Sequence, residues 1–122
     1  MSKKKDPREV KFNKDLRRAE SERKQMHRLV SKQDAWQFMH RMVDEMSDLT
    51  VKVLKLEHAL WVYHSHDGVV DKWFTEFASK LPGVDRQLLV RQYKAMVQYL
   101  HILDQRWMRF VAAQRKGEEH AR

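Results

Sequence analysis

The firmest pattern in the chain is a series of apolar residues in its middle, separated alternately by four and three positions. This spacing is typical of a long helix that packs one face against another helix. It predicts a central helix that runs to about His66 and ends at Gly68. The apolar positions of the series are Ala35, Met39, Met42, Met46, Leu49, Val53, Leu56, Leu60 and Tyr63.

A second apolar row lies beside the first, so the central helix has two neighbours to contact. This row contains Leu29, Trp36, Val43, Val51, Leu54 and Trp61. One neighbour is a third long segment, which begins near Asp85 and ends at Lys116 and Gly117. Its apolar residues recur at the same spacing, at Leu89, Tyr93, Met96, Leu100, Leu103, Trp107 and Phe110.

The connection between the two long helices has about fifteen residues, which lets the helices return antiparallel. We expect it to contain a short amphipathic helix, stopped by Pro82 and Gly83. The apolar positions of this short helix are Val70, Trp73, Phe74, Phe77 and Leu81.

The N-terminal region predicts a helix that starts with Asp6 as cap, Pro7 in the first turn and Glu9 closing a capping box. Its apolar stripe is thin, so the helix needs a partner or a continuation. Ser31 and Asp34 offer a second capping box. The step of five residues from Val30 to Ala35 also interrupts the spacing of four and three, which favours a kink or a break in the helix there. One continuous helix over residues 7–66 is the open alternative.

Composition agrees with an all-α fold, because 122 residues include only three glycines and two prolines. We predict a long antiparallel helical hairpin with an inserted short amphipathic helix and a basic N-terminal helical arm, assembling into a helical bundle. The chain has no cysteine, which excludes disulfides and thiolate metal sites. It also has no apolar run of the ~20 residues that span a bilayer. We expect a cytoplasmic protein, or one assembled into a virion from the cytoplasm.

The net charge of +8 is concentrated at one end. Residues 1–32 hold twelve Lys and Arg against five Asp and Glu, whereas residues 33–122 hold thirteen against twelve. We therefore divide the chain into a basic arm, 1–32, and a nearly neutral hairpin domain, 33–122. Such an arm is typical of contact with a polyanion such as nucleic acid. The candidate contacts are Lys3, Lys4, Lys5, Arg8, Lys11, Lys14, Arg17, Arg18, Arg23, Lys24 and Arg28.

The alternative for the arm is a solvated helix face whose charges pair with one another. Acidic residues are interleaved, and the spacing allows pairs such as Asp15 with Arg18 and Glu20 with Lys24. Phe12 is the arm's one aromatic residue, which argues against base stacking.

Candidate chemistry is sparse. His64, Ser65, His66 and Asp67 form a local cluster, and its His-Asp pair resembles the pair that names a class of all-α metal-dependent phosphohydrolases. Histidines favoured by a helix C-terminus explain it better, because residues 64 and 66 cannot share a helix face.

A second possible polar site has Glu57 and His58 facing His101 and Asp104 across the hairpin. No nucleophile or glycine-rich phosphate loop accompanies it. We expect no enzyme activity, no metal and no cofactor.

These patterns favour a non-catalytic interaction or assembly protein, such as a phage or virion structural component, a scaffold or an inhibitor. Its body would dock on a protein partner or on itself, with a homodimer preferred, while the arm meets a polyanion. A sequence-nonspecific nucleic-acid-binding module is the alternative. The expected interface residues are Trp36, Val43, Trp61, Trp73, Phe74, Phe77 and Trp107.

Overall fold

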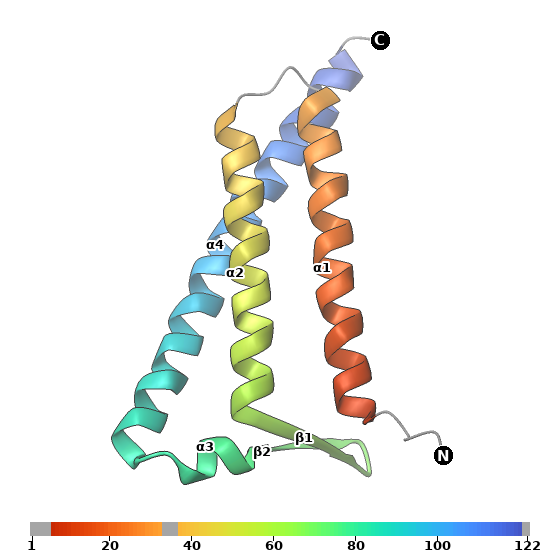
Figure 1. The fold of residues 1–122 in the computed structure, drawn as a ribbon. Helices are drawn as coiled ribbons and strands as arrows, with labels where there is room; N and C mark the ends of the chain where they lie inside the picture. The colour runs from red at the N-terminus through yellow and green to blue at the C-terminus, as the bar shows by residue number, and fades with distance from the viewer. Residues whose placement is uncertain (1–5, 33–36, 121–122) are drawn as a thin grey trace.

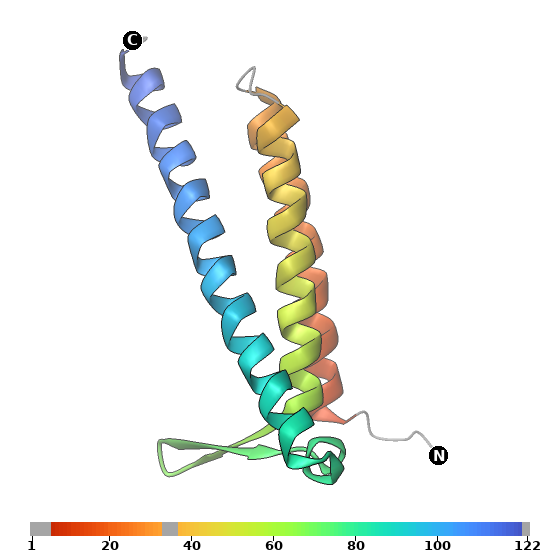
Figure 2. The same ribbon diagram turned by 90° about the vertical axis from the view of Figure 1, so that its left-hand side faces the viewer.

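The computed structural model describes residues 6–32 and 37–120. In chain order they form helices α1 (Pro7–Lys32) and α2 (Gln37–Leu60), strands β1 (Trp61–His66) and β2 (Val69–Phe74), and helices α3 (Glu76–Lys80) and α4 (Gly83–His120). α1 and α4 run in one direction and α2 runs in the other (Figure 1). The strands, α3 and the start of α4 gather at one end of the molecule, which Figure 2 shows from the side.

The helix α2 is the centre of the packing, since it contacts both α1 and α4. α2 supplies four of the seven buried members of the larger core cluster, and α1 and α4 contribute one and two residues. Burying a side chain of this size contributes about 1.5–3 kcal/mol. The buried members are Val30, Met39, Met42, Val43, Met46, Leu103 and Trp107. A second cluster packs at the end of the molecule that carries the strands and consists of Leu60, Trp61 and Ala78.

The predicted start of the N-terminal helix is confirmed. The carboxylate of Asp6 accepts a hydrogen bond from the backbone N–H of Arg8 at 3.0 Å. Glu9 does not close a capping box on this helix; its Oε1 lies 2.7 Å from Nε2 of His58 on α2. The first turn of α1 is therefore fixed to the last turn of α2.

Residues 7–66 are not one continuous helix. α1 and α2 are separate and pack against each other in opposite directions (Figure 1). Among the apolar residues of α1, Ala19 and Val30 are buried, whereas Val10 is exposed. The predicted restart near Lys32 is wrong, because Ser31 and Lys32 belong to α1 and Ser31 does not begin a new helix. Asp34, Ala35 and Trp36 lie outside the described residues.

The prediction that the central helix continues to His66 is wrong. α2 ends at Leu60 and the chain enters β1 directly, pairing antiparallel with β2 from Trp61 opposite Phe74 to His66 opposite Val69. Asp67 and Gly68 form the turn, with φ of 48° and 80°. Positive φ at both central residues is the requirement of a type I′ hairpin, for which Asp-Gly is a favoured pair.

The predicted short helix over residues 70–81 is also wrong in its first half. Residues 69–74 form β2, and the helix α3 is confined to Glu76–Lys80. Thr75 separates the two elements, because its hydroxyl accepts a hydrogen bond from the N–H of Ala78 and so caps α3. The all-α class is accordingly only approximately right. α4 begins at Gly83 and extends beyond Gly117 to His120.

Two residues distant in the sequence, Arg8 and Thr75, bind carbonyl groups at the junction of α2 and β1. The guanidinium of Arg8 donates to the carbonyl oxygens of His58 and, at 3.0 Å, of Trp61. Thr75 donates from its hydroxyl to Ala59 at 2.5 Å and from its N–H to Leu60 at 2.9 Å. The last carbonyls of a helix have no partner within the helix. These contacts allow a strand to follow α2 without a loop.

Candidate functional site

The end of the molecule formed by β2 and α3 exposes large apolar side chains. Five of them, each 42–63% exposed, define what we call the apolar end surface, which includes both faces of the hairpin and α3: Val69, Val70, Trp73, Phe74 and Phe77. Monomeric proteins rarely leave such side chains together in water unless the surface binds something. Aromatic residues in particular supply most of the energy at protein interfaces.

The hairpin has two different faces, because residues paired across the strands point to the same side. On one face Trp61 is buried, with its ring edge-to-face against Tyr93 of α4 at 4.7 Å between centroids and the ammonium of Lys72 4.1 Å from its centre. On the other face Trp73 is exposed, and the centre of its ring lies 4.6 Å from the centre of the His64 ring. One tryptophan thus anchors the hairpin, and the other faces solvent.

A shallow hollow of about 420 Å³ adjoins the apolar end surface between β2 and α4. Its lining is mostly apolar, with two arginines and no carboxylate: Phe74, Arg86, Gln87, Val90 and Arg91. The guanidinium of Arg86 lies 5.1 Å from the centre of the Phe74 ring. The hollow therefore suits an apolar group that lies next to a negative charge.

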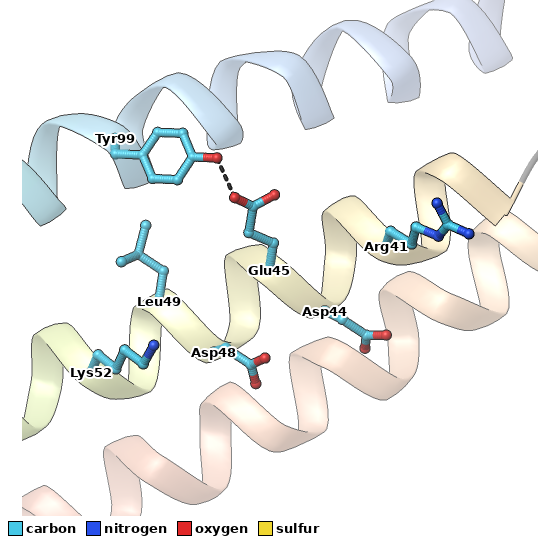
Figure 3. A pocket seen from close by; sticks show the side chains of 7 residues that line it. All are labelled: Arg41, Asp44, Glu45, Asp48, Leu49, Lys52 and Tyr99. Atoms are coloured by element: carbon cyan, nitrogen blue, oxygen red, sulfur yellow. Dashed lines mark hydrogen bonds between the residues drawn. The ribbon is translucent and has the colours of Figure 1, made fainter.

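A second hollow, of about 450 Å³, lies along α2 and reaches α4 through Tyr99 (Figure 3). Its walls carry carboxylates and cations together: Arg41, Asp44, Glu45, Asp48, Leu49, Lys52 and Tyr99. The hydroxyl of Tyr99 donates to Glu45, and this hydrogen bond is the main cause that raises the pKa of Tyr99. With its charges mixed and no nucleophile beside a base, this hollow has the character of an ordinary solvated surface.

A polar network joins α1 and α2, and no pattern in the sequence predicted it. Nε2 of His27 lies 2.7 Å from Oδ1 of Asp44, and Nδ1 of His27 lies 2.8 Å from Nδ1 of His40. Nε of Arg23 donates to the same oxygen of Asp44 at 3.1 Å. Because the carboxylate accepts, Nε2 of His27 is the donor. The network positions α1 on α2.

The basic residues of the predicted polyanion site separate into two groups. Arg8 and Arg23 are used inside the fold, as described above, and Lys11 pairs with Asp15 at 3.8 Å. The other five described residues are exposed and form no ion pair with any described residue: Lys14, Arg17, Arg18, Lys24 and Arg28. Lys3, Lys4 and Lys5 lie outside the described residues. The expected pairs Asp15–Arg18 and Glu20–Lys24 are replaced by Lys11–Asp15 and Glu20–Arg23.

The predicted interface residues also separate. Val43, Trp61 and Trp107 are buried within this chain and are unavailable to a partner. The other three described members are exposed at the apolar end surface, namely Trp73, Phe74 and Phe77. Trp36 lies outside the described residues. The spacing of apolar residues did not identify Val69 as part of this surface. The Asp-Gly pair that follows β1 is a hairpin signal, and it would have placed Val69 on a strand.

The two candidate chemical sites are not assembled. Among the described residues no group of three or more His, Asp or Glu side chains could hold a metal ion. His66 and Asp67 lie exposed at the hairpin turn, 3.3 Å apart, so the helix-terminus explanation for His64 and His66 is wrong too.

Glu57 and His58 do not face His101. Glu57 accepts a hydrogen bond from Tyr93 at 2.9 Å, and His58 stacks on Phe12 with centroids 4.1 Å apart. His101 lies within hydrogen-bonding distance of Gln105 on its own helix. The polar site predicted across the long helices is therefore absent from the described residues.

Residues 37–109 match the model of a protein family described as Sequestin. No curated protein and no solved structure matches the chain. The matched range covers α2, the hairpin, α3 and most of α4, and it leaves out α1. Within the described residues no helix is long and apolar enough to cross a membrane.

Proposed function

The chain belongs to the Sequestin family, and on this premise we propose that it is a small, non-catalytic binding protein that sequesters a protein partner at its apolar end surface. The family name points to a protein that binds or sequesters. The single observation that carries the proposal is the exposure of Trp73, Phe74 and Phe77 on a hairpin and helix held rigidly by the core.

The part of the chain that the family shares supports this assignment. Residues 37–109 contain all of the apolar end surface and the neighbouring hollow, but none of the basic arm. A function common to the family has to reside in shared residues. The body, rather than the arm, is therefore the better place for it.

The support beneath the surface suits it for binding. Trp61 fixes the base of the hairpin in the second core cluster, and Thr75 ties β2 to the end of α2. Rigid aromatic side chains lose little conformational entropy when a partner covers them. Trp73 and Phe77 are the strongest candidates for the residues that dominate affinity.

The hollow beside the surface indicates the chemistry of the partner. Arg86 and Arg91 flank an apolar floor formed by Phe74 and Val90, without a carboxylate in the lining. We propose a partner that inserts an apolar side chain next to one or more acidic residues. Cytoplasmic location, expected from the sequence, is part of the same proposal.

The test compares two double variants by affinity purification of the full-length chain from the cells in which it naturally occurs. Trp73→Ser with Phe77→Ser alters the apolar end surface. Val97→Ser with Ile102→Ser removes two exposed apolar side chains of α4 outside it. We expect wild type and the α4 variant to retain the same protein partner and the end-surface variant to lose it. The purified partner should then rebind with an affinity that falls at least about tenfold in the end-surface variant.

Self-association is the competing arrangement and is measured directly. Light scattering gives the mass in solution, and a dimer that becomes a monomer only in the Trp73→Ser, Phe77→Ser variant assigns the surface to a second copy. That outcome, or equal loss of the partner in both variants, contradicts sequestration at this surface.

A further inference from the structure

We infer that the outward face of α1 binds the phosphate backbone of nucleic acid without reading its base sequence. This site goes beyond the proposed function, because it lies on α1, outside the residues shared with the family. It rests on five exposed cations, which we call the basic stripe: Lys14, Arg17, Arg18, Lys24 and Arg28.

The stripe is a consequence of helical geometry. At 3.6 residues per turn its five members fall within roughly 120° of the helix circumference, and at 1.5 Å per residue they extend over about 21 Å. The uncharged residues within the same arc include Val10, Ser21 and Gln25. Five positive charges therefore occupy one continuous face, with no carboxylate among them.

The acidic residues of α1 lie on its flanks. The four of them, Glu9, Asp15, Glu20 and Glu22, all project outside the roughly 120° arc. Three are engaged there, since Glu9 contacts His58 of α2, Asp15 pairs with Lys11 and Glu20 pairs with Arg23. The sequence left open the alternative that acids pair with the cations of the arm, but around the helix axis the four acids lie outside the arc of the stripe.

The packing of α1 keeps the stripe exposed. Ala19 and Val30 are buried, and Arg23 reaches Asp44 of α2. These residues project from the side of α1 opposite the middle of the stripe. An amphipathic helix inserts into a membrane through its apolar face, but the apolar face of α1 is covered by α2. A lipid surface is therefore the weaker match for this face.

The residue types fit phosphates. Three of the five are arginines, whose guanidinium groups bind phosphate oxygens in pairs of hydrogen bonds. A duplex presents one negative charge per ~1.7 Å of its axis, so a stripe of about 21 Å meets several phosphates at once. No aromatic side chain lies in the arc to stack on bases. Binding is accordingly electrostatic and independent of sequence.

The test measures binding of the full-length chain to a labelled duplex by fluorescence anisotropy, from about 50 to about 200 mM NaCl. The stripe variant carries Arg17→Gln, Arg18→Gln and Arg28→Gln. We expect its affinity at the lowest salt to fall about tenfold or more, and the slope of log K against log salt to lose about 2.7 of its magnitude. The same substitutions to lysine retain the charges and should retain the slope.

A matched control removes three positive charges from exposed positions of α4, with Lys94→Gln, Arg109→Gln and Arg115→Gln. It should bind the duplex like wild type, and equal loss in the two variants would overturn the proposal. Stripe-dependent binding to vesicles of anionic phospholipid, without binding to duplex, would overturn it as well. The Trp73→Ser, Phe77→Ser variant should bind duplex normally, which separates this site from the proposed docking function.

Discussion

The hydroxyl of Thr75 donates a hydrogen bond to the carbonyl oxygen of Ala59 at 2.5 Å, across a hairpin of fourteen residues that runs from Trp61 to Phe74. The hydroxyl oxygen of Thr75 also accepts a hydrogen bond from the N–H of Ala78 at 3.1 Å. One buried side chain therefore ends α2, begins α3 and fixes the hairpin that carries the apolar end surface.

Replacing Thr75 with valine retains its shape but removes both hydrogen bonds. We expect Thr75→Val to lower the free energy of unfolding by about 1–3 kcal/mol, because a cap is lost and a carbonyl is left without its partner. Thr50→Val is the control, since the Thr50 hydroxyl bonds the carbonyl of Met46 within α2 and should cost below about 0.5 kcal/mol. Urea unfolding of both variants measures the difference, and equal losses would contradict the role of Thr75.

The turn of the hairpin depends on glycine. Gly68 has φ of 80°, in the left-handed region that an alanine enters at a cost of about 1–2 kcal/mol. Gly68→Ala should therefore be destabilising although nothing lies within 4 Å of the added carbon. Gly117→Ala, within α4 and equally unobstructed, should be neutral or stabilising by up to about 1 kcal/mol. Thermal unfolding of the two variants tests whether Gly68→Ala lowers the stability while Gly117→Ala leaves it unchanged or raises it.

The sequence predicted the long helices because their burial follows a regular period. Met39, Met42 and Met46 lie in the larger core cluster with Leu103 and Trp107, as the alternation of four and three indicates. Periodicity cannot tell whether an apolar residue meets its own chain or another. Val43 and Trp107 were accordingly predicted at an interface between proteins, and they lie in the core of this one.

The hairpin was missed because Tyr63 continues the spacing of the seam by coincidence. Asp67 and Gly68 then read equally well as a helix end, although Asp-Gly between Val- and Trp-containing segments is a strong hairpin signal. The role of Arg8 was beyond sequence reasoning, because its acceptors on His58 and Trp61 lie 50 and 53 residues away. Helical geometry alone places the cations of the basic stripe on one face of α1, but only the structure shows that α2 covers the opposite face.

Tyrosine ionisation reports the contact between α2 and α4. Burial, followed by the hydrogen bond to Glu57, raises the pKa of Tyr93, and burial together with the charge of Glu57 raises that of Tyr63. Glu57→Gln removes the charge, so the pKa of both should move down towards the ordinary value of about 10. Absorbance of the phenolates against pH measures this change, with Glu45→Gln as the matched control that acts on Tyr99. A titration unaffected by Glu57→Gln would contradict this contact.

Because of the polar network between α1 and α2, we expect the free energy of unfolding to decrease at acid pH. The hydrogen bond from His27 is the main cause that lowers the pKa of Asp44, and the charges of His27 and Arg23 act in the same direction, against a raising effect of burial. A carboxyl whose pKa is lower in the folded state contributes stability above its unfolded pKa of about 3.9 and loses it as the pH falls through the folded pKa.

We therefore expect Asp44→Asn to lower the free energy of unfolding near neutral pH by no more than about 1 kcal/mol, because the side chain is half exposed and solvent screens it. The difference from wild type should begin to shrink below about pH 4, where Asp44 of the unfolded chain is protonated, and should vanish below the lower pKa of folded Asp44. Asp48→Asn is the control, since Asp48 lines the same hollow and forms no ion pair with another described residue. Urea unfolding at neutral and acid pH distinguishes the two variants. If Asp44→Asn and Asp48→Asn follow the same pH dependence, then the contact of Asp44 with His27 and Arg23 does not stabilise the packing of α1 on α2.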